Sequence, residues 1–170
     1  MRSDDVSRIG QFSFAGTHAM LTFQRRFPHS PEAVWAAITD PKRLAAWYMQ
    51  RVFIDGRLGG SIEFVSDGGK LHATGQILAW EPPRLLEYEW KVKPRPMMPS
   101  GEDTIVRWEL LREGPEAVLT LTHLNLTQGK AFGAAPFIHV VLERLGTHLD
   151  RRPFQDFGRR VAEIQTQYAA

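Results

Sequence analysis

The sequence predicts an α+β protein in which a curved antiparallel sheet wraps around a long C-terminal helix, with two short helices after the first strand. Three observations support this prediction. Helical periodicity occurs only near residues 31–48 and after residue 136. Between these segments, apolar and polar residues alternate in five or six short runs, which turns join into sequential hairpins. The long final helix must bury its apolar stripe, and the inner face of that sheet is the surface available to it.

The first part of the fold combines one strand with two short helices. Residues 1–18 are mostly polar and are expected to form a loose lead-in with one weak strand. Ala19–Phe27 has the pattern of a strand. Ser30 suits the N-cap and Pro31 the first helical position, so a helix is expected to begin there. Asp40 precedes a proline, which ends this helix, and its side chain can cap a second short helix. The apolar residues of the two helices are Val34, Trp35, Ile38, Leu44, Trp47 and Tyr48.

Period-two alternation indicates the strands that follow. They are expected to cover Val52–Ile54, Ile62–Phe64, Leu71–Trp80, Leu85–Val92, Thr104–Leu111 and Val118–Leu124. Glycine pairs and prolines between the runs mark the turns. One face of the last three strands is expected to be buried and carries Leu86, Tyr88, Trp90, Val106, Trp108, Leu110, Leu119, Leu121 and His123. The proline-rich segment 94–101, which contains Met97 and Met98, is expected to form a loop at the rim.

Two helices are expected at the end of the chain. In Pro136–Asp150, apolar residues recur at helical spacing at Phe137, Ile138, Val141, Leu142, Leu145 and Leu149. A second helix is expected within residues 153–168, with a narrow apolar seam of Phe154, Phe157, Val161, Ile164 and Tyr168. We favour packing of this seam on its own domain over packing on a second copy, and the two alternatives correspond to a monomer or a homodimer. The chain is thus divided into a lead-in (1–18), one domain (19–150) and an additional C-terminal helix (151–170).

The composition fits one globular domain. The chain has 170 residues, of which 43% are hydrophobic and 24% charged, and its mean hydropathy is −0.28. The absence of cysteine excludes thiol catalysis and cysteine zinc sites and fits a reducing compartment. No apolar run approaches the roughly 20 residues of a membrane-spanning helix, and the first residues lack the apolar stretch of a secretory signal. We therefore expect no membrane span and a cytoplasmic location.

The charge pattern does not indicate a nucleic-acid-binding protein. The chain has 21 basic and 19 acidic residues, which gives a net charge of +2. Arginine doublets occur at Arg25–Arg26, Arg151–Arg152 and Arg159–Arg160, but they are scattered along the sequence and accompany no recognition motif. We expect these arginines to lie on solvated faces and expect no nucleic-acid partner.

Several segments resemble one protein family in their order and spacing. Phe27–Pro41, with the sequence FPHSPEAVWAAITDP, and Leu44–Tyr48, with the sequence LAAWY, resemble the opening of START-like (SRPBCC) proteins. They resemble specifically the branch named after the activator of heat-shock protein 90 ATPase. Further matching segments are Gly59–Phe64, Gly75–Leu78, Pro82–Leu85, Leu119–His123, Val141–Leu145 and His148–Leu149. The resemblance covers roughly residues 19–150 and implies a helix-grip fold. It implies no single activity, because family members include ligand carriers, aromatic cyclases and chaperone cofactors.

The candidate site lies between the sheet and the long helix, because a twisted sheet that curls around one helix leaves a concave space there. The residues expected to line this space are Trp80, Tyr88, Trp90, Val106, Trp108, Leu121, His123, Phe137, Val141 and Leu145. The large rings among them suit a flat or aliphatic ligand, and ordinary core filling is the alternative. His123 could orient a polar ligand group or act as a base, and the alternative is a core histidine bonded to a backbone carbonyl. The sequence identifies no partner acid for it.

No catalytic set or metal site is predicted. His139 and Glu143 are one helical turn apart, and His72 and His123 lie on strands, but no spacing matches a zinc motif. No nucleophile motif, phosphate-binding loop or dinucleotide fingerprint occurs in the chain. We therefore expect no cofactor, no metal and no catalytic residues.

The main functional hypothesis is a binding module that encloses a hydrophobic or aromatic small molecule, without enzyme activity. Two alternatives remain open. One is a cyclase or hydrolase-like enzyme that uses the same cavity, with His123, Tyr88 or an inward-facing glutamate as acid or base. The other is a protein partner, such as a chaperone whose ATPase is stimulated, as the family name implies.

Overall fold

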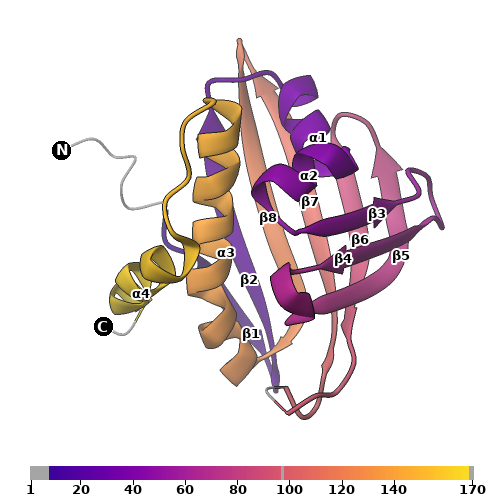
Figure 1. Ribbon diagram of the computed structural model, residues 1–170, viewed down its shortest axis with the longest axis vertical. Helices are drawn as coiled ribbons and strands as arrows, with labels where there is room; N and C mark the ends of the chain where they lie inside the picture. The colour runs from indigo at the N-terminus through magenta and orange to yellow at the C-terminus, as the bar shows by residue number, and fades with distance from the viewer. Residues whose placement is uncertain (1–7, 97, 169–170) are drawn as a thin grey trace.

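One antiparallel sheet of eight strands forms the frame of the protein, and a long helix lies across its concave face (Figure 1). The computed structural model describes residues 8–96 and 98–168. The strands are β1 (Gln11–Ala15), β2 (His18–Phe27), β3 (Arg51–Ile54), β4 (Ser61–Val65), β5 (His72–Glu81), β6 (Leu85–Val92), β7 (Glu102–Glu113) and β8 (Glu116–Thr127). They pair in the order β1-β2-β8-β7-β6-β5-β4-β3. The helices are α1 (Pro31–Thr39), α2 (Pro41–Trp47), the short 3-10 helix η1 (Asp67–Gly69), α3 (Gln128–Leu149) and α4 (Phe157–Tyr168). The predicted α+β fold with a sheet wrapped around a long C-terminal helix is confirmed.

The two short helices begin where the sequence predicts. The Ser30 hydroxyl accepts a hydrogen bond from a backbone N–H of the first turn of α1 at 3.2 Å, and the Asp40 carboxylate caps α2 in the same way at 3.0 Å. Such caps each stabilise a helix by about 1 kcal/mol. The indole N–H of Trp47 donates to the backbone carbonyl of Ala37 at 2.9 Å, which fixes α2 against α1.

The helix α3 differs from its prediction in length and in orientation. It begins at Gln128, eight residues before the expected start, and contains Pro136 in its interior. The first two turns carry glycines and alanines rather than large apolar residues, so periodicity did not reveal them. The expectation that Phe137 faces the sheet is wrong, because its side chain is 49% exposed. His139, which is not part of the predicted apolar stripe, is buried at 3% exposure.

The helix α4 packs on the outer side of α3, as expected for its apolar seam (Figure 1). Val161 and Ile164 are buried against Val140 of α3. The hydroxyl of Tyr168 accepts a hydrogen bond from the backbone N–H of Gly10 at 2.8 Å. The C-terminal helix is therefore joined to both α3 and the segment that leads into β1.

The strand β1 pairs with β2 at the edge of the sheet, which confirms the weak strand expected within residues 1–18. Residues 1–7 lie outside the described part of the chain. In the described part, no helix combines the length and the apolar character needed to span a membrane.

Candidate ligand site between the sheet and the long helix

The strand register aligns the predicted site residues in two neighbouring rows on the inner face of the sheet. The first row runs through Ile77, Tyr88, Val106, His123 and Leu21. The second row runs through Trp80, Leu86, Trp108, Leu121 and Phe23. Backbone pairing thus places six of the predicted residues in these rows, and they are Trp80, Tyr88, Val106, Trp108, Leu121 and His123.

An aromatic cluster of Tyr48, Phe64, Tyr88 and Trp90 covers one end of these rows. The ring of Phe64 is central, with centroid distances of 5.7 Å to Tyr88, 5.5 Å to Trp90 and 5.6 Å to Tyr48. Sequence reasoning selected Tyr88 and Trp90 but treated Phe64 as a strand residue and Tyr48 as helix packing. Tyr48 immediately follows α2, and the turn of the chain at this point places its ring over the sheet.

Both tyrosines of the aromatic cluster lie in a poorly solvated environment. Burial raises the pKa of Tyr88, although its hydroxyl accepts a hydrogen bond from the indole N–H of Trp108 at 3.1 Å. Burial also raises the pKa of Tyr48, and the charges of Tyr88 and Glu102 act in the same direction. Both hydroxyls therefore remain protonated near neutral pH and can donate to a ligand oxygen.

A buried polar cluster of Glu102, Thr104 and His123 lies beside the aromatic cluster. The Nε2 atom of His123 is 2.7 Å from the Thr104 hydroxyl oxygen and 3.4 Å from Oε1 of Glu102. The side chains of His123 and Glu102 are each only 10% exposed. The Thr104 hydroxyl also lies 3.3 Å from the backbone carbonyl oxygen of Trp90, so it can donate to it. The cluster can bind a hydroxyl or carbonyl group, or transfer a proton between the imidazole and the carboxylate.

The loop before β7 places the polar cluster next to the first turns of α3. Gly101 adopts φ +63°, and a Cβ atom there would lie 2.4 Å from the carbonyl oxygen of Val92, so glycine is required for this close turn. The ammonium group of Lys130 in α3 donates to the carbonyl oxygen of Gly101. This contact holds α3 against the loop that leads to Glu102.

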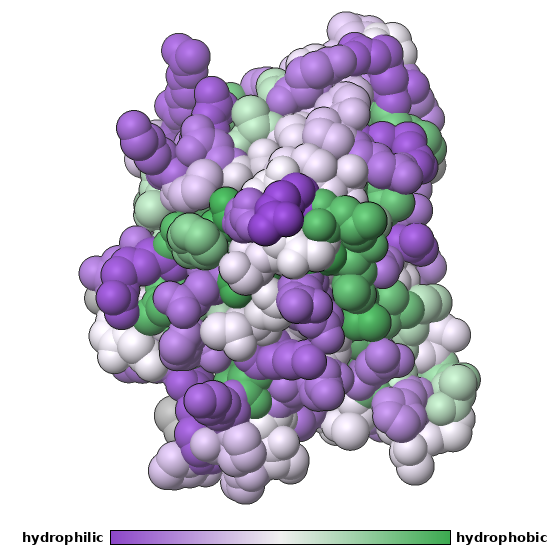
Figure 2. Space-filling view, turned by 90° about the vertical axis from the view of Figure 1, so that its right-hand side faces the viewer, coloured by the Kyte–Doolittle hydropathy of each residue, from purple (hydrophilic) through white to green (hydrophobic). Residues whose placement is uncertain are grey.

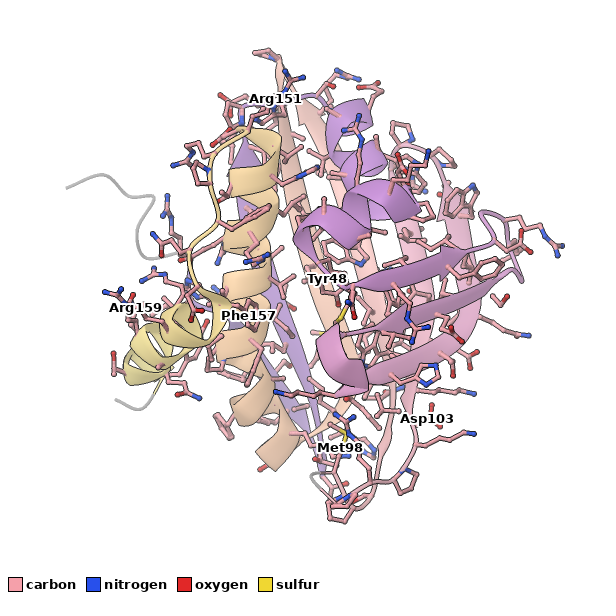
Figure 3. The ribbon with its side chains drawn as sticks, in the orientation of Figure 1. Tyr48, Met98, Asp103, Arg151, Phe157 and Arg159 are labelled. Carbon is pink, nitrogen blue, oxygen red and sulfur yellow. The ribbon has the colours of Figure 1, made fainter. Side chains whose placement is uncertain are left out.

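Several apolar side chains of α3 and of the turns before β3, β5 and β7 pack on the main core yet remain partly exposed. We group them under the name entry seam; they are Tyr48, Met49, Leu71, Met98, Ala134, Ile138 and Val141. In Figure 3, Tyr48 lies beside η1 on the side that faces α3, and Met98 lies near the first turns of α3. Met97, which was expected at the same rim, lies outside the described residues.

Three predicted site residues lie away from these clusters. Trp80 packs edge-on against Trp35 of α1, with a centroid distance of 5.2 Å. Phe137 points outward, and its ring centroid is 6.2 Å from that of Phe157 in α4. Leu145 is fully buried in the second half of α3.

Two hollows of the described structure lie outside the space between sheet and helix. One of about 750 Å³ lies between β2, α3 and residues 150–156, and one of about 450 Å³ lies between α1 and the end of α3. Neither is lined by a residue of the aromatic cluster. The expected cavity therefore stays a prediction, and the rings of the aromatic cluster fill the space in part themselves.

Hydrophobic side chains also reach the surface elsewhere. Figure 2 shows several of them on the face toward which the β3–β4 turn points. Phe53 on β3 is 57% exposed, and Leu58 in that turn is 69% exposed. These side chains are a second place at which an apolar probe can bind.

The histidine and glutamate considered for a metal site have protein partners instead. The Nδ1 atom of His139 is 3.0 Å from the Tyr168 hydroxyl, and Glu143 accepts two hydrogen bonds from Arg160, both at 2.8 Å. Within the described residues, no group of three histidine, aspartate or glutamate side chains is placed to hold a metal ion.

Comparison with known proteins gives one family and a set of related folds. The model of the family described as activator of Hsp90 ATPase homolog 1-like protein matches residues 28–150. A crystal structure of CalU16 from Micromonospora echinospora is 25% identical, with a TM-score of 0.71 over 94% of this chain and 93% of that one. The protein MLL2253 from Mesorhizobium loti is 22% identical, with a TM-score of 0.70 over 79% of this chain and 99% of that one. EF2215 from Enterococcus faecalis, described as a conserved protein of unknown function, is 16% identical, with a TM-score of 0.70 over 94% and 90% of the two chains. No curated protein matches the chain. These likenesses agree with the helix-grip fold.

Proposed function

Because the chain belongs to the activator of Hsp90 ATPase homolog 1-like family, we propose that it is a binding module for a small apolar or aromatic molecule that carries one polar group. The ligand would lie between the aromatic cluster and α3 and would enter along the entry seam. Its polar group would meet the polar cluster.

The buried polar cluster is the observation that carries this proposal. Placing a carboxylate and an imidazole in an apolar interior costs desolvation free energy, and replacing such a pair by apolar residues is often neutral or stabilising. A core that only had to be stable would not need Glu102 and His123 at 10% exposure. Their position beside four aromatic rings suits a ligand with an apolar body and a hydroxyl or carbonyl at one end.

The side chains of α3 support the same location. The entry seam includes a stripe of three α3 residues at helical spacing, Ala134, Ile138 and Val141, and all three are short or β-branched. They are only partly buried, in contrast to the fully buried Leu142. Separating this stripe from the opposite turns would expose the rings of the aromatic cluster at a lower cost than opening the buried side of α3.

Filling the site with a side chain tests the proposal. Val141→Trp places an indole in the space proposed for the ligand. It is expected to abolish binding of the neutral dye Nile red and of neutral lipids or aromatic metabolites retained in native mass spectrometry. Leu111→Trp is the matched control, because Leu111 is 62% exposed on β7 and the same ring enters solvent there. If side chains already fill this space, Val141→Trp would instead lower the free energy of unfolding by about 1–3 kcal/mol through overpacking. A large fall in melting temperature without any difference in binding from Leu111→Trp would refute the proposal.

An acid–base enzyme is the second candidate, and the partnership of His123 with Glu102 favours it. A carboxylate 3.4 Å from an imidazole can hold its orientation and stabilise its charged form. The reaction would use the same site, so the two candidates differ in whether His123 only orients the ligand or also transfers a proton. A chaperone partner and a cytoplasmic location stay predictions.

A further inference from the structure

The larger of the two hollows is lined by arginines that are far apart in the sequence. It has a volume of about 750 Å³ and lies between β2, α3, residues 150–156 and the start of α4. The arginines in its wall are Arg8, Arg25, Arg26, Arg144, Arg152 and Arg160. Among the described residues, Glu143 is the single carboxylate in the same wall. Each of the three arginine doublets contributes at least one residue, so doublets that are scattered along the sequence and largely exposed converge in the fold.

Figure 3 shows how the fold brings this group together. Arg151 marks the end of α3 and Arg159 lies on α4, and the chain between them runs back alongside α3. Their doublet neighbours, Arg152 and Arg160, turn to the hollow. The edge of β2 closes the other side, because β1 pairs only with residues 18–22 of that strand, and in the described part of the chain no strand pairs with residues 23–27 on this edge.

Three of these arginines already have carboxylate partners. Arg160 is paired with Glu143 and Glu163, Arg26 with Glu113 and Glu116, and Arg152 with Asp150. These pairs hold the wall of the hollow in place.

The other three lack such a partner within the described part of the chain, where no carboxylate lies within 4 Å of Arg8, Arg25 or Arg144. Arg25 donates to the backbone carbonyls of Gln24 at 2.8 Å and of Arg8 at 2.6 Å. Arg144 donates to the backbone carbonyl of Trp47 at 2.9 Å, and its guanidinium lies 4.3 Å from the centroid of the Phe154 ring. Carbonyl oxygens orient these guanidinium groups without neutralising them.

Partial burial of these charged guanidinium groups lowers the stability of the fold unless a bound anion neutralises their charge. Burial lowers the pKa of Arg25 to about 10, and the charge of Arg8 acts in the same direction. Burial also lowers the pKa of Arg144. Both groups remain charged at neutral pH, although the charge of Glu143 acts to raise the pKa of Arg25. The described part of the chain thus holds two partly desolvated cations in one wall, with no carboxylate within 4 Å of either.

We propose that this hollow binds a small molecule through a phosphate or a similar oxyanion group. A guanidinium group can donate two parallel hydrogen bonds to the oxygens of a phosphate, and a bound anion would supply the negative charge that these arginines lack as a partner. The volume lies within the roughly 300–1,000 Å³ of small-molecule sites. Phe27 and Val118, which are mostly buried but reach the wall of the hollow, add a small apolar surface for the organic part of the ligand. Because the arginines converge on a hollow rather than follow an extended face, a small molecule fits better than a nucleic acid.

This site is independent of the proposed apolar site. The hollow shares no residue with the aromatic cluster, the polar cluster or the entry seam. Binding of an oxyanion can therefore be measured whether or not an apolar ligand binds.

Titration calorimetry with inorganic pyrophosphate and inorganic phosphate, at ionic strength held constant with sodium chloride, tests the proposal. The full chain is expected to bind one pyrophosphate. Arg25→Gln is expected to weaken binding at least about tenfold, because it removes the charged hydrogen bonds from the guanidinium group to the phosphate oxygens. Arg8→Gln, at an exposed position, is expected to weaken binding as well, and keeps the test valid if Arg25→Gln does not fold. Arg57→Gln is the control, because it removes the same charge from the β3–β4 turn, where Arg57 pairs with Asp55.

Several results would overturn the proposal. One is the absence of saturable binding at millimolar pyrophosphate. Another is equal affinity of Arg25→Gln, Arg8→Gln and Arg57→Gln for pyrophosphate. A single-stranded oligonucleotide that binds where pyrophosphate does not would assign the arginines to nucleic acid instead.

Discussion

His123 contacts two polar side chains of the neighbouring strand, and these contacts determine what its imidazole can do. With Thr104 at 2.7 Å and Glu102 at 3.4 Å, the Nε2 atom is oriented on the side toward β7. A ligand group can reach the polar cluster only by joining or displacing these contacts. The imidazole therefore serves either as an oriented polar contact or as a base supported by a carboxylate.

Replacing this imidazole separates the two roles. His123→Gln keeps a polar side chain of similar length but removes the imidazole, which is the group that could act as a base. A binding module is expected to keep its ligand affinity within about tenfold, whereas an acid–base enzyme is expected to lose about 100-fold or more in rate. The measurements are ligand affinity and turnover with the molecule identified by native mass spectrometry. A large loss of rate at unchanged affinity would contradict the binding module and favour the enzyme.

The residues of the polar cluster also mark how far the sequence could predict the site. The alternation of β8 placed His123 on the inner face, and this is confirmed. Its partners were not predicted, because Thr104 and Glu102 become neighbours only through the β7–β8 register, which pairs Val106 with His123. Glu102 falls between the predicted loop 94–101 and the strand predicted from Thr104, because the prolines and glycine before it obscure the start of β7.

At the scale of elements, α4 is attached to α3 by a small apolar contact and by one strong ion pair. Val161 and Ile164 supply the apolar contact, and Arg160 donates two hydrogen bonds to Glu143. Burial alone would raise the pKa of Glu143, but hydrogen bonds from Arg160 and His139 outweigh it and lower that pKa to about 2. The ion pair therefore persists at a pH at which a free glutamate would be protonated.

This shift predicts a pH-dependent stability. A carboxyl whose pKa is lower in the folded state stabilises the fold above its usual pKa of about 4.5, and the contribution is lost as the pH falls toward 2. Glu143→Gln is expected to be less stable than wild type by about 1–3 kcal/mol at neutral pH and equally stable near pH 2. Urea unfolding across this range measures the difference, with Glu109→Gln on the outer face of β7 as the control. A difference that stays constant down to pH 2 would show that the ion pair does not contribute in this way.

The elements themselves were predicted with unequal success, for physical reasons. Caps and turns depend on a few adjacent residues, so α1, α2 and the strands from β3 to β6 lie close to their expected positions. The start of α3 depends on packing of small side chains such as Ala131 and Ala135, which are fully buried but carry no clear periodic signal. A rule that starts helices at proline placed the boundary at Pro136, in the middle of the actual helix.

At the scale of the whole molecule, the sequence predicted the sheet but not the surfaces that assemble from distant parts. Sequential hairpins imply a meander, and β3 to β8 form one. The meander closes on β2, which pairs with β8 and so joins the two ends of the domain. The arginine-lined hollow needs β2, the end of α3 and α4 together, and no local pattern could show this convergence.

The two proposed sites lie in separate parts of the molecule, so a neutral probe and an anionic probe report on them independently. The central claim is that an apolar ligand binds between α3 and the aromatic cluster. The most direct test is nuclear magnetic resonance of methyl-labelled protein with bound Nile red, in which intermolecular Overhauser effects identify the contacting residues. We expect contacts from the dye to Ile138 and Val141. Contacts confined to Leu58 and the neighbouring surface of the β3–β4 turn would contradict the central claim.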